Sequence, residues 1–93
     1  MRRTRWTPRF KKDVRREMRG IYAKSLQSDL AALIGLLEVD AELPDRYRDH
    51  QLSGALRDLR DCHLRPDLLV LYRKPDPLTL ELVRLASHSE LGF

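Results

Sequence analysis

The fold is decided by residues 56–84, LRDLRDCHLRPDLLVLYRKPDPLTLELVR, which predict three consecutive β-strands. Residues 56–64 alternate in part between polar and apolar, a period that places Asp61 and His63 on one face of a strand. Residues 68–73 form an apolar run typical of a central strand that is buried on both faces. The first two strands are therefore expected to pair side by side.

The third strand follows a tight Pro-Asp-Pro connection at residues 75–77. Strand alternation then predicts one shared face for four side chains: Leu78, Leu80, Leu82 and Arg84. A lone cation on a leucine face needs a partner or a ligand. An ion pair with a carboxylate such as Glu81 or Glu90 is one possibility, and an anionic substrate is the other.

Two helices are predicted before the strands. Thr7 is a suitable N-cap for a helix that begins at Pro8, and Phe10, Val14 and Met18 recur at every fourth position. A second helix carries a broader apolar stripe, made of Leu26, Leu30, Leu33, Ile34 and Leu37. The two helices are expected to form a hairpin.

The remaining segments complete one small domain over residues 1–93. Residues 3–6 are a candidate edge strand, and residues 40–53, which include His50, lose all periodicity and are expected to form a loop. The sequence thus predicts an α+β fold, with two N-terminal helices packed on a small, mainly antiparallel sheet of three to four strands.

Charge is distributed unevenly along the chain. Residues 1–24 carry ten Lys and Arg against two acidic residues, whereas the rest carries eight basic and twelve acidic residues. A basic end on an otherwise acidic chain favours a nucleic-acid surface or an acidic protein partner. A merely solvated helix face is the alternative.

The single cysteine, Cys62, excludes a disulfide framework. Neighbouring strand residues point to opposite faces, so Cys62 is expected in the core, away from His63, and not as a nucleophile. The charged N-terminus lacks the apolar stretch of a signal peptide, and no run is long enough to span a bilayer. A cytoplasmic protein with no membrane partner is expected.

The three histidines lie in the second half of the chain and supply the chemistry of phosphodiester cleavage. His50, His63 and His88, with Asp67 and Arg84, can provide a base, an acid and a cation for the charged phosphoryl oxygens. Surface or turn positions are the plain alternative for each of them. The spacing contains no close ligand pair such as HxH or HExxH, so neither a metal nor another cofactor is expected.

Four segments resemble the YafQ-type toxins of the RelE/ParE superfamily: TPRFKKD (7–13), YRDHQLSG (47–54), RDCHLRPDLLVLY (60–72) and LVRLASHSEL (82–91). The resemblance implies a RelE-like fold and a ribosome-dependent mRNA endonuclease, the toxin of a bacterial type II toxin–antitoxin pair. Such toxins enter the ribosomal A site, cut the mRNA there and stop translation.

Carried over by resemblance, the active-site positions are His50, His63, Asp67, Arg84 and His88. The resemblance suggests Asp67 as general base, His88 as general acid and Arg84 on the scissile phosphate. His50 and His63 would position the RNA and stabilise charge.

Two positions of this sequence depart from the family pattern. Leu68 occupies a position where the family often has tryptophan, and Gly92 stands where an aromatic residue is usual, one residue before Phe93.

The resemblance also implies partners, namely a cognate antitoxin, the ribosome with its rRNA and mRNA, and operator DNA only through the antitoxin complex. The expected contacts to the ribosome and RNA are Arg9, Lys11, Lys12, Arg15, Arg16, Arg19 and Phe93. Three other functions remain open: a ParE-like inhibitor that acts by binding alone, a catalytically degenerate antitoxin-binding protein, and a small basic nucleic-acid-binding module.

Overall fold

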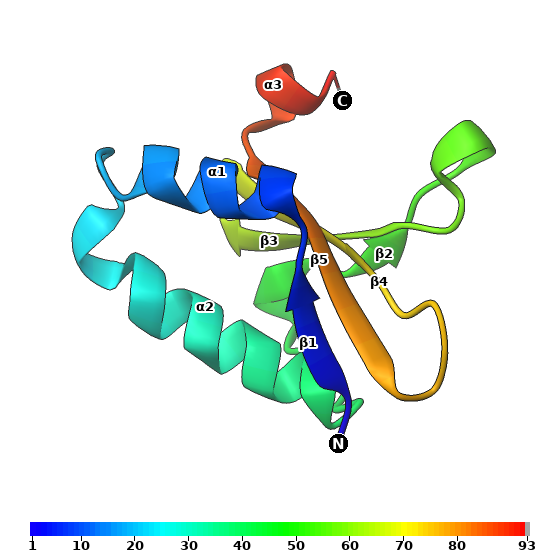
Figure 1. Cartoon of the computed structure of the whole chain (residues 1–93). Helices are drawn as coiled ribbons and strands as arrows, with labels where there is room; N and C mark the ends of the chain where they lie inside the picture. The colour runs from blue at the N-terminus through cyan, green and yellow to red at the C-terminus, as the bar shows by residue number, and fades with distance from the viewer. Residues whose placement is uncertain (93) are drawn as a thin grey trace.

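The computed structural model describes residues 1–92. Its two N-terminal helices lie on one side of a twisted sheet, and the short C-terminal helix lies beyond the end of the sheet (Figure 1). The helices are α1 (Pro8–Glu17), α2 (Ala23–Glu38) and the short α3 (His88–Leu91). The strands are β1 (Arg3–Trp6), β2 (His50–Gln51), β3 (Arg60–Arg65), β4 (Leu68–Arg73) and β5 (Thr79–Ala86). Within residues 1–92, none of the helices has the length and apolar character that crossing a membrane requires.

The sheet has five strands in the order β1-β5-β4-β3-β2. Strand β1 runs parallel to β5, whereas the other neighbours are antiparallel. The predicted α+β fold and the edge strand at residues 3–6 are confirmed, but the count of three to four strands is one too low. The additional strand is β2, which contains His50 and lies in the segment that was expected to be a loop.

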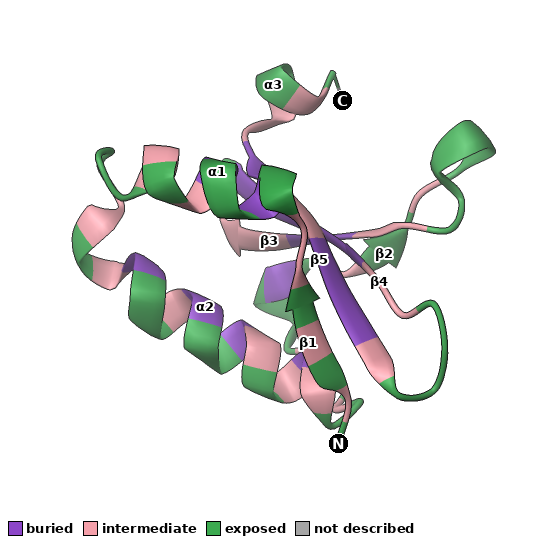
Figure 2. Ribbon diagram, viewed as in Figure 1, coloured by how far each residue is buried: buried purple, intermediate pink, exposed green. Residues whose placement is uncertain are grey.

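Helix α2 covers one face of the sheet and closes the core, as the buried segments of Figure 2 show. Its buried side chains are Leu26, Leu30, Leu33 and Leu37. They belong to one cluster with Cys62, Leu68, Val70, Tyr72, Leu80, Leu82 and Leu85 of the sheet. Burial raises the pKa of the Cys62 thiol, which makes it a weak nucleophile and confirms that Cys62 is a core residue.

Helix α1 lies against the C-terminal half of β5. The Thr7 hydroxyl accepts a hydrogen bond from the Phe10 N–H (3.1 Å), and Pro8 occupies the first turn, as the N-cap pattern predicts. The Trp6 and Phe10 rings meet edge to face, with centroids 5.1 Å apart. The start of α1 is therefore fixed both by its cap and by the core.

A β-bulge in β5 overturns one prediction. Tyr72 pairs with Leu82, but its neighbour Leu71 pairs with Arg84, so Val83 is an extra residue in β5. The bulge interrupts strict alternation and places Arg84 beside Leu71, on the face opposite the leucines of the core. Arg84 therefore does not share a face with Leu80 and Leu82, because a uniform period of two does not hold along this strand.

Candidate active site

The strand register gathers the predicted site residues on the sheet face that α2 leaves open. One row crosses four strands through the pairs His50–Asp61, Asp61–Leu71 and Leu71–Arg84. Paired residues of neighbouring strands lie on the same face, about 5 Å apart across the sheet. The predicted His50 and Arg84 thus lie on one face of the sheet, although 34 positions separate them in the sequence.

A second row of paired residues lies two residues further along each strand on the same face. It consists of His63, Leu69 and Ala86. His88 follows Ala86 by two residues and begins α3. The imidazole rings of His63 and His88 lie 5.2 Å apart, measured between centroids, at an angle of 61°. Two of the three predicted histidines are therefore direct neighbours.

Asp67 joins this pair from the turn between β3 and β4. Pro66 and Asp67 form a two-residue turn, because Arg65 pairs with Leu68. The Asp67 Oδ1 lies 3.3 Å from His88 Nδ1, and the Asp67 side chain is 71% exposed. The turn therefore brings a solvent-accessible carboxylate and an imidazole into hydrogen-bond range, an arrangement suited to moving a proton.

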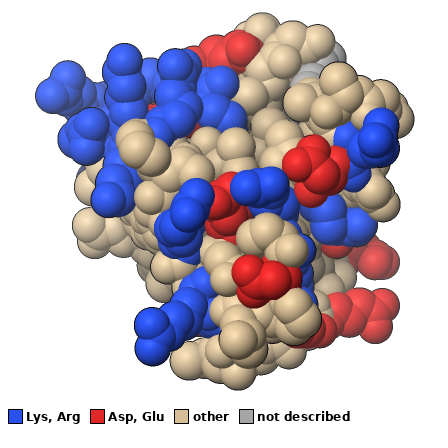
Figure 3. All heavy atoms as spheres, turned by 45° about the vertical axis from the view of Figure 1, so that its right-hand side comes forward, with Lys and Arg blue, Asp and Glu red and all other residues tan. Residues whose placement is uncertain are grey.

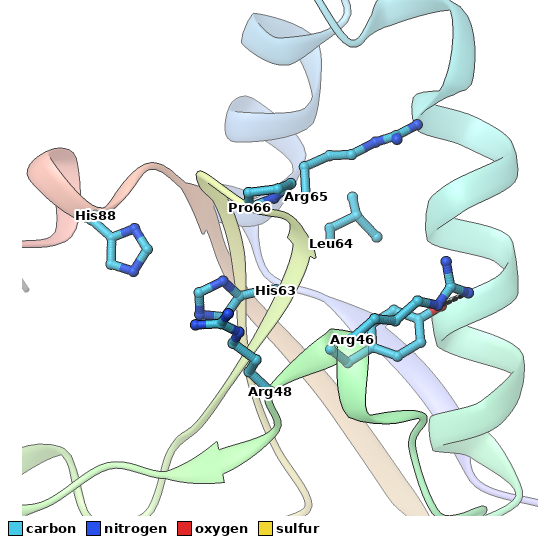
Figure 4. Close-up of a pocket in the computed structure, with 8 residues that line it drawn as sticks. Arg46, Arg48, His63, Leu64, Arg65, Pro66 and His88 are labelled. Carbon is cyan, nitrogen blue, oxygen red and sulfur yellow. Dashed lines mark hydrogen bonds between the residues drawn. The ribbon is translucent and has the colours of Figure 1, made fainter.

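A pocket of about 520 Å³ opens beside these histidines (Figure 4). Its lining residues are Arg46, Tyr47, Arg48, His63, Leu64, Arg65, Pro66 and His88. Sequence analysis missed Arg46 and Arg48, which precede β2 in a segment that shows only scattered charge. Arg48 lies beside His63 (Figure 4), whereas the guanidinium groups of Arg46 and Arg65 are engaged by Tyr47 and by Asp29. One guanidinium next to two imidazoles gives this side of the pocket the character of an anion site.

His50 is held between two acceptors. Its Nδ1 lies 2.8 Å from the Arg48 carbonyl, and its Nε2 lies 3.6 Å from Asp61 Oδ2. The ring is therefore oriented by a hydrogen bond to a backbone carbonyl on one side and faces a buried carboxylate on the other. Arg48 itself adopts a left-handed backbone conformation (φ 48°), which is uncommon for a residue other than glycine.

Asp61 is the acidic residue that the sequence did not single out. Its side chain is 4% exposed, and its Oδ1 has no hydrogen-bond partner among residues 1–92. Burial raises the pKa of Asp61, while the charges of His50, His63 and His88 oppose that increase. The only sequence signal was its alternation with His63 along one strand.

Arg84 is held by an acid of helix α1. Its Nε donates to Asp13 Oδ2 at 2.8 Å, and its side chain is 22% exposed. An ion pair was one of the expected possibilities, but Asp13 takes the place of Glu81 or Glu90. Sequence analysis could not name this partner, because 71 positions separate the two residues.

The basic face of α1 forms the broad cluster of Lys and Arg in Figure 3. A second pocket, of about 480 Å³, is lined there by Arg9, Lys12, Asp13, Arg15, Arg16 and Arg19. Lys11 is also exposed. Arg16 differs from the others, because its guanidinium donates to the Leu85 carbonyl at 2.8 Å and therefore also docks the helix.

The two departures from the family pattern have different outcomes. Leu68 is 2% exposed and packs in the core, so it offers no surface on which a base could stack. Phe93 lies outside the described residues. Among residues 1–92, no group of three or more His, Cys, Asp or Glu side chains is arranged to hold a metal ion.

Comparison with known proteins identifies relatives of the whole chain. A family model described as a bacterial toxin of type II toxin–antitoxin systems, YafQ, matches residues 2–92. A metal-bound toxin from Helicobacter pylori is 41% identical, with 98% of this chain and 99% of that chain covered and a TM-score of 0.84. The Escherichia coli DinJ–YafQ complex matches at 27% identity, 98% of both chains and a TM-score of 0.82.

Among curated proteins, the mRNA interferase toxin YafQ of Escherichia coli K12 is 39% identical over 49 residues. That match covers 53% of this chain and 52% of the relative, so it spans about half the length of either. The fold, the histidine-lined site and these similarities together define a toxin of the type II toxin–antitoxin class. Within that class, the chain belongs to the YafQ family, as the resemblance indicated.

Proposed function

We propose that this protein is a ribosome-dependent endoribonuclease that cuts mRNA in the A site and thereby inhibits translation. The observation that carries the proposal is the cluster of His63, His88 and Asp67 on the same open sheet face as Arg84. Relatives that carry the name mRNA interferase support it. The reaction needs no cofactor, because these side chains can supply the acid, the base and the cation.

In the proposed mechanism, Asp67 removes the proton from a ribose 2′-hydroxyl, whose oxygen attacks the adjacent phosphorus. The bond from phosphorus to the 5′-oxygen breaks, and His88 donates the proton that this leaving oxygen takes. Arg84 stabilises the negative charge on the phosphoryl oxygens. His50 and His63 orient the RNA and add positive charge near the pocket.

The two proton-transfer roles can be separated by pH–rate profiles. We expect Asp67→Ala to remove the limb caused by the base and His88→Ala to remove the limb caused by the acid, each with a loss of about 10²- to 10⁴-fold in rate. Single-turnover cleavage by programmed ribosomes provides the measurement. The assignment is wrong if both variants keep both limbs.

The proposed partners are expected to bind different parts of the surface. The basic face of α1 contacts rRNA phosphates, and the pocket of His63 and His88 receives the mRNA. A cognate antitoxin neutralises the toxin, in keeping with the structures of the DinJ–YafQ complex. Operator DNA is bound only through the antitoxin complex, and the protein acts in the cytoplasm, where ribosomes are found.

Primer extension on mRNA tests the proposal directly. Purified protein is incubated with mRNA, with and without programmed ribosomes, beside the His88→Ala variant. We expect cuts within the A-site codon that require ribosomes and are lost in the variant. Cuts on free mRNA would contradict ribosome dependence. A folded protein that binds ribosomes but leaves mRNA intact would instead favour a catalytically degenerate family member, in which the buried Leu68 offers no stacking surface for a base.

A further inference from the structure

Asp13 is a fully buried carboxylate at the junction between α1 and β5. Its Oδ2 accepts from Arg84 Nε at 2.8 Å and from the Leu85 N–H at 2.9 Å. Its Oδ1 lies 3.1 Å from Arg16 Nη1 and 3.4 Å from Arg9 Nε. One acid therefore connects the basic helix to the strand that carries Arg84.

Asp13 remains ionised although it is buried. Burial alone would raise the pKa of this carboxyl group, but the hydrogen bonds from Arg84 and the Leu85 N–H and the positive charges of Arg84 and Arg16 lower it below 3.8. A buried charge that lost these partners would be costly. The Asp13–Arg84 pair is therefore a fixed feature of the fold at neutral pH.

The Asp13–Arg84 pair also determines which nitrogens of the Arg84 guanidinium can bind a ligand. Among residues 1–92, the hydrogen bonds of the Arg84 guanidinium use only its Nε, which leaves the two terminal nitrogens for another acceptor. Those two nitrogens form a planar fork that matches two oxygens of one phosphate. The partly exposed side chain lies in the same row as Asp61 and His50.

We propose that Asp13 is a positioning residue, which locks Arg84 so that its terminal nitrogens face the scissile phosphate. This inference rests on the proposed endoribonuclease function and extends it to a residue outside the site. Asp13 touches no substrate itself. Its effect is to remove the rotational freedom of Arg84 before the substrate arrives, and even a displacement of about 1 Å can cost about 100-fold in rate.

A purely structural role is the competing explanation, because Asp13 and Arg16 also dock α1 on Leu85. A double-mutant cycle separates the two explanations. We expect Asp13→Asn to lower the single-turnover cleavage rate by about 10- to 100-fold, with less than about a twofold change in the ribosome concentration at half saturation. In an Arg84→Ala background, the same substitution should have almost no further effect.

Glu17→Gln is the matched control. Glu17 lies on the same helix and accepts from Arg16 Nε at 3.0 Å, but it makes no hydrogen bond or ion pair to Arg84. We expect its rate to stay within about twofold of the wild-type rate, because no hydrogen bond or ion pair links Glu17 to Arg84. Equal losses from Asp13→Asn with and without Arg84, or a folded Asp13→Asn protein with the full rate, would overturn the proposal.

A measurement on the unmodified protein covers the case in which Asp13→Asn does not fold. NMR of the Arg84 Nε–H should show restricted motion and slow exchange with water, because that hydrogen is held by a buried carboxylate. A freely moving Arg84 side chain would overturn the proposal. If the wild-type protein does not cleave mRNA, the proposed function fails, and the NMR result alone decides whether Asp13 locks Arg84.

Discussion

At the scale of single residues, the buried carboxylate of Asp61 is expected to lower the stability of the fold while it supports the proposed site. Its carboxylate is buried, faces His50 and lacks a hydrogen bond to Oδ1 among residues 1–92. Because burial raises its pKa in the folded state, the folded protein binds the Asp61 proton more tightly than the unfolded chain does. The contribution of Asp61 to the free energy of unfolding therefore falls as pH rises from 3.8 through the raised pKa.

Replacing Asp61 should separate its effect on stability from its effect on cleavage. At neutral pH we expect Asp61→Asn to raise Tm by a few degrees, because about 1 kcal/mol shifts Tm by roughly 4–8 °C in a domain of this size. The gain should vanish below pH 3.8, where Asp61 is protonated in both states. Cleavage should slow, because His50 loses the carboxylate that its Nε2 faces.

Thermal unfolding followed by circular dichroism across pH provides the measurement, with Asp58→Asn as the control. The Asp58 side chain is 63% exposed, so its replacement should leave Tm nearly unchanged. A lower Tm for Asp61→Asn at neutral pH would mean that the ion pair with His50 outweighs the cost of burial.

The limits of sequence analysis are clear at this scale. Residue type made the five proposed site residues candidates, because few other side chains can act as acid, base or phosphate-binding cation near neutral pH. The resemblance to the YafQ family then carried them over as active-site positions. Asp61 and Asp13 were missed for a different reason. Their importance comes from burial and from contacts across the fold, neither of which the local sequence contains.

At the scale of elements, the cap of α1 and the bulge of β5 depend on one hydroxyl group. Thr7 Oγ1 accepts from the Phe10 N–H at 3.1 Å and donates to the Val83 carbonyl at 3.2 Å. We expect Thr7→Ala to lower the free energy of unfolding by about 1–2 kcal/mol, as the loss of a helix cap typically does. Thr7→Ser keeps the hydroxyl and should recover most of that loss. Urea denaturation gives both values, and equal values for the two variants would exclude a role for the hydroxyl.

The basic surface formed by α1 and the turn after it allows a second prediction at this scale. Replacing both Arg15 and Arg19 with Gln should weaken ribosome binding and reduce its dependence on salt concentration, because fewer counterions are released. Arg16 is left in place, since it docks the helix on Leu85.

The control for this prediction removes the same charge elsewhere, by replacing the exposed Arg3 and Arg57 with Gln. Binding measured at several salt concentrations should then resemble that of the wild-type protein. Equal losses from the two double variants would mean that overall charge, and not the face of α1, governs binding.

The periodicity of the sequence predicted some helices and strands well and others not at all. Helices α1 and α2 and strand β4 have long, regular patterns, and the structure contains all three. Strand β2 has two residues, too few to show a period, and it forms only because β3 offers an edge. The bulge at Val83 has no local signature, because pairing with β4 and the contact to Thr7 stabilise it.

At the scale of the whole molecule, the buried thiol of Cys62 reports on the integrity of the core. Cys62 has no exposed surface, and its raised pKa disfavours the reactive thiolate. Modification by a thiol reagent should therefore be very slow in the native protein and should accelerate with urea in parallel with global unfolding. Rapid labelling without denaturant would show that the sheet and α2 separate locally. Unfolded protein labelled under the same conditions supplies the reference rate.

The bulge in β5 also determines how the chain tolerates changes in length. Deleting Val83 would restore plain alternation, with Leu82 and Leu85 still facing the core and Arg84 and Ala86 still on the open face. The hydrogen bond from Thr7 to its carbonyl would be lost, but no side chain would change sides. A one-residue gap at this point of a sequence alignment therefore leaves the site composition intact, whereas a one-residue insertion or deletion within β4 would invert both faces of that strand.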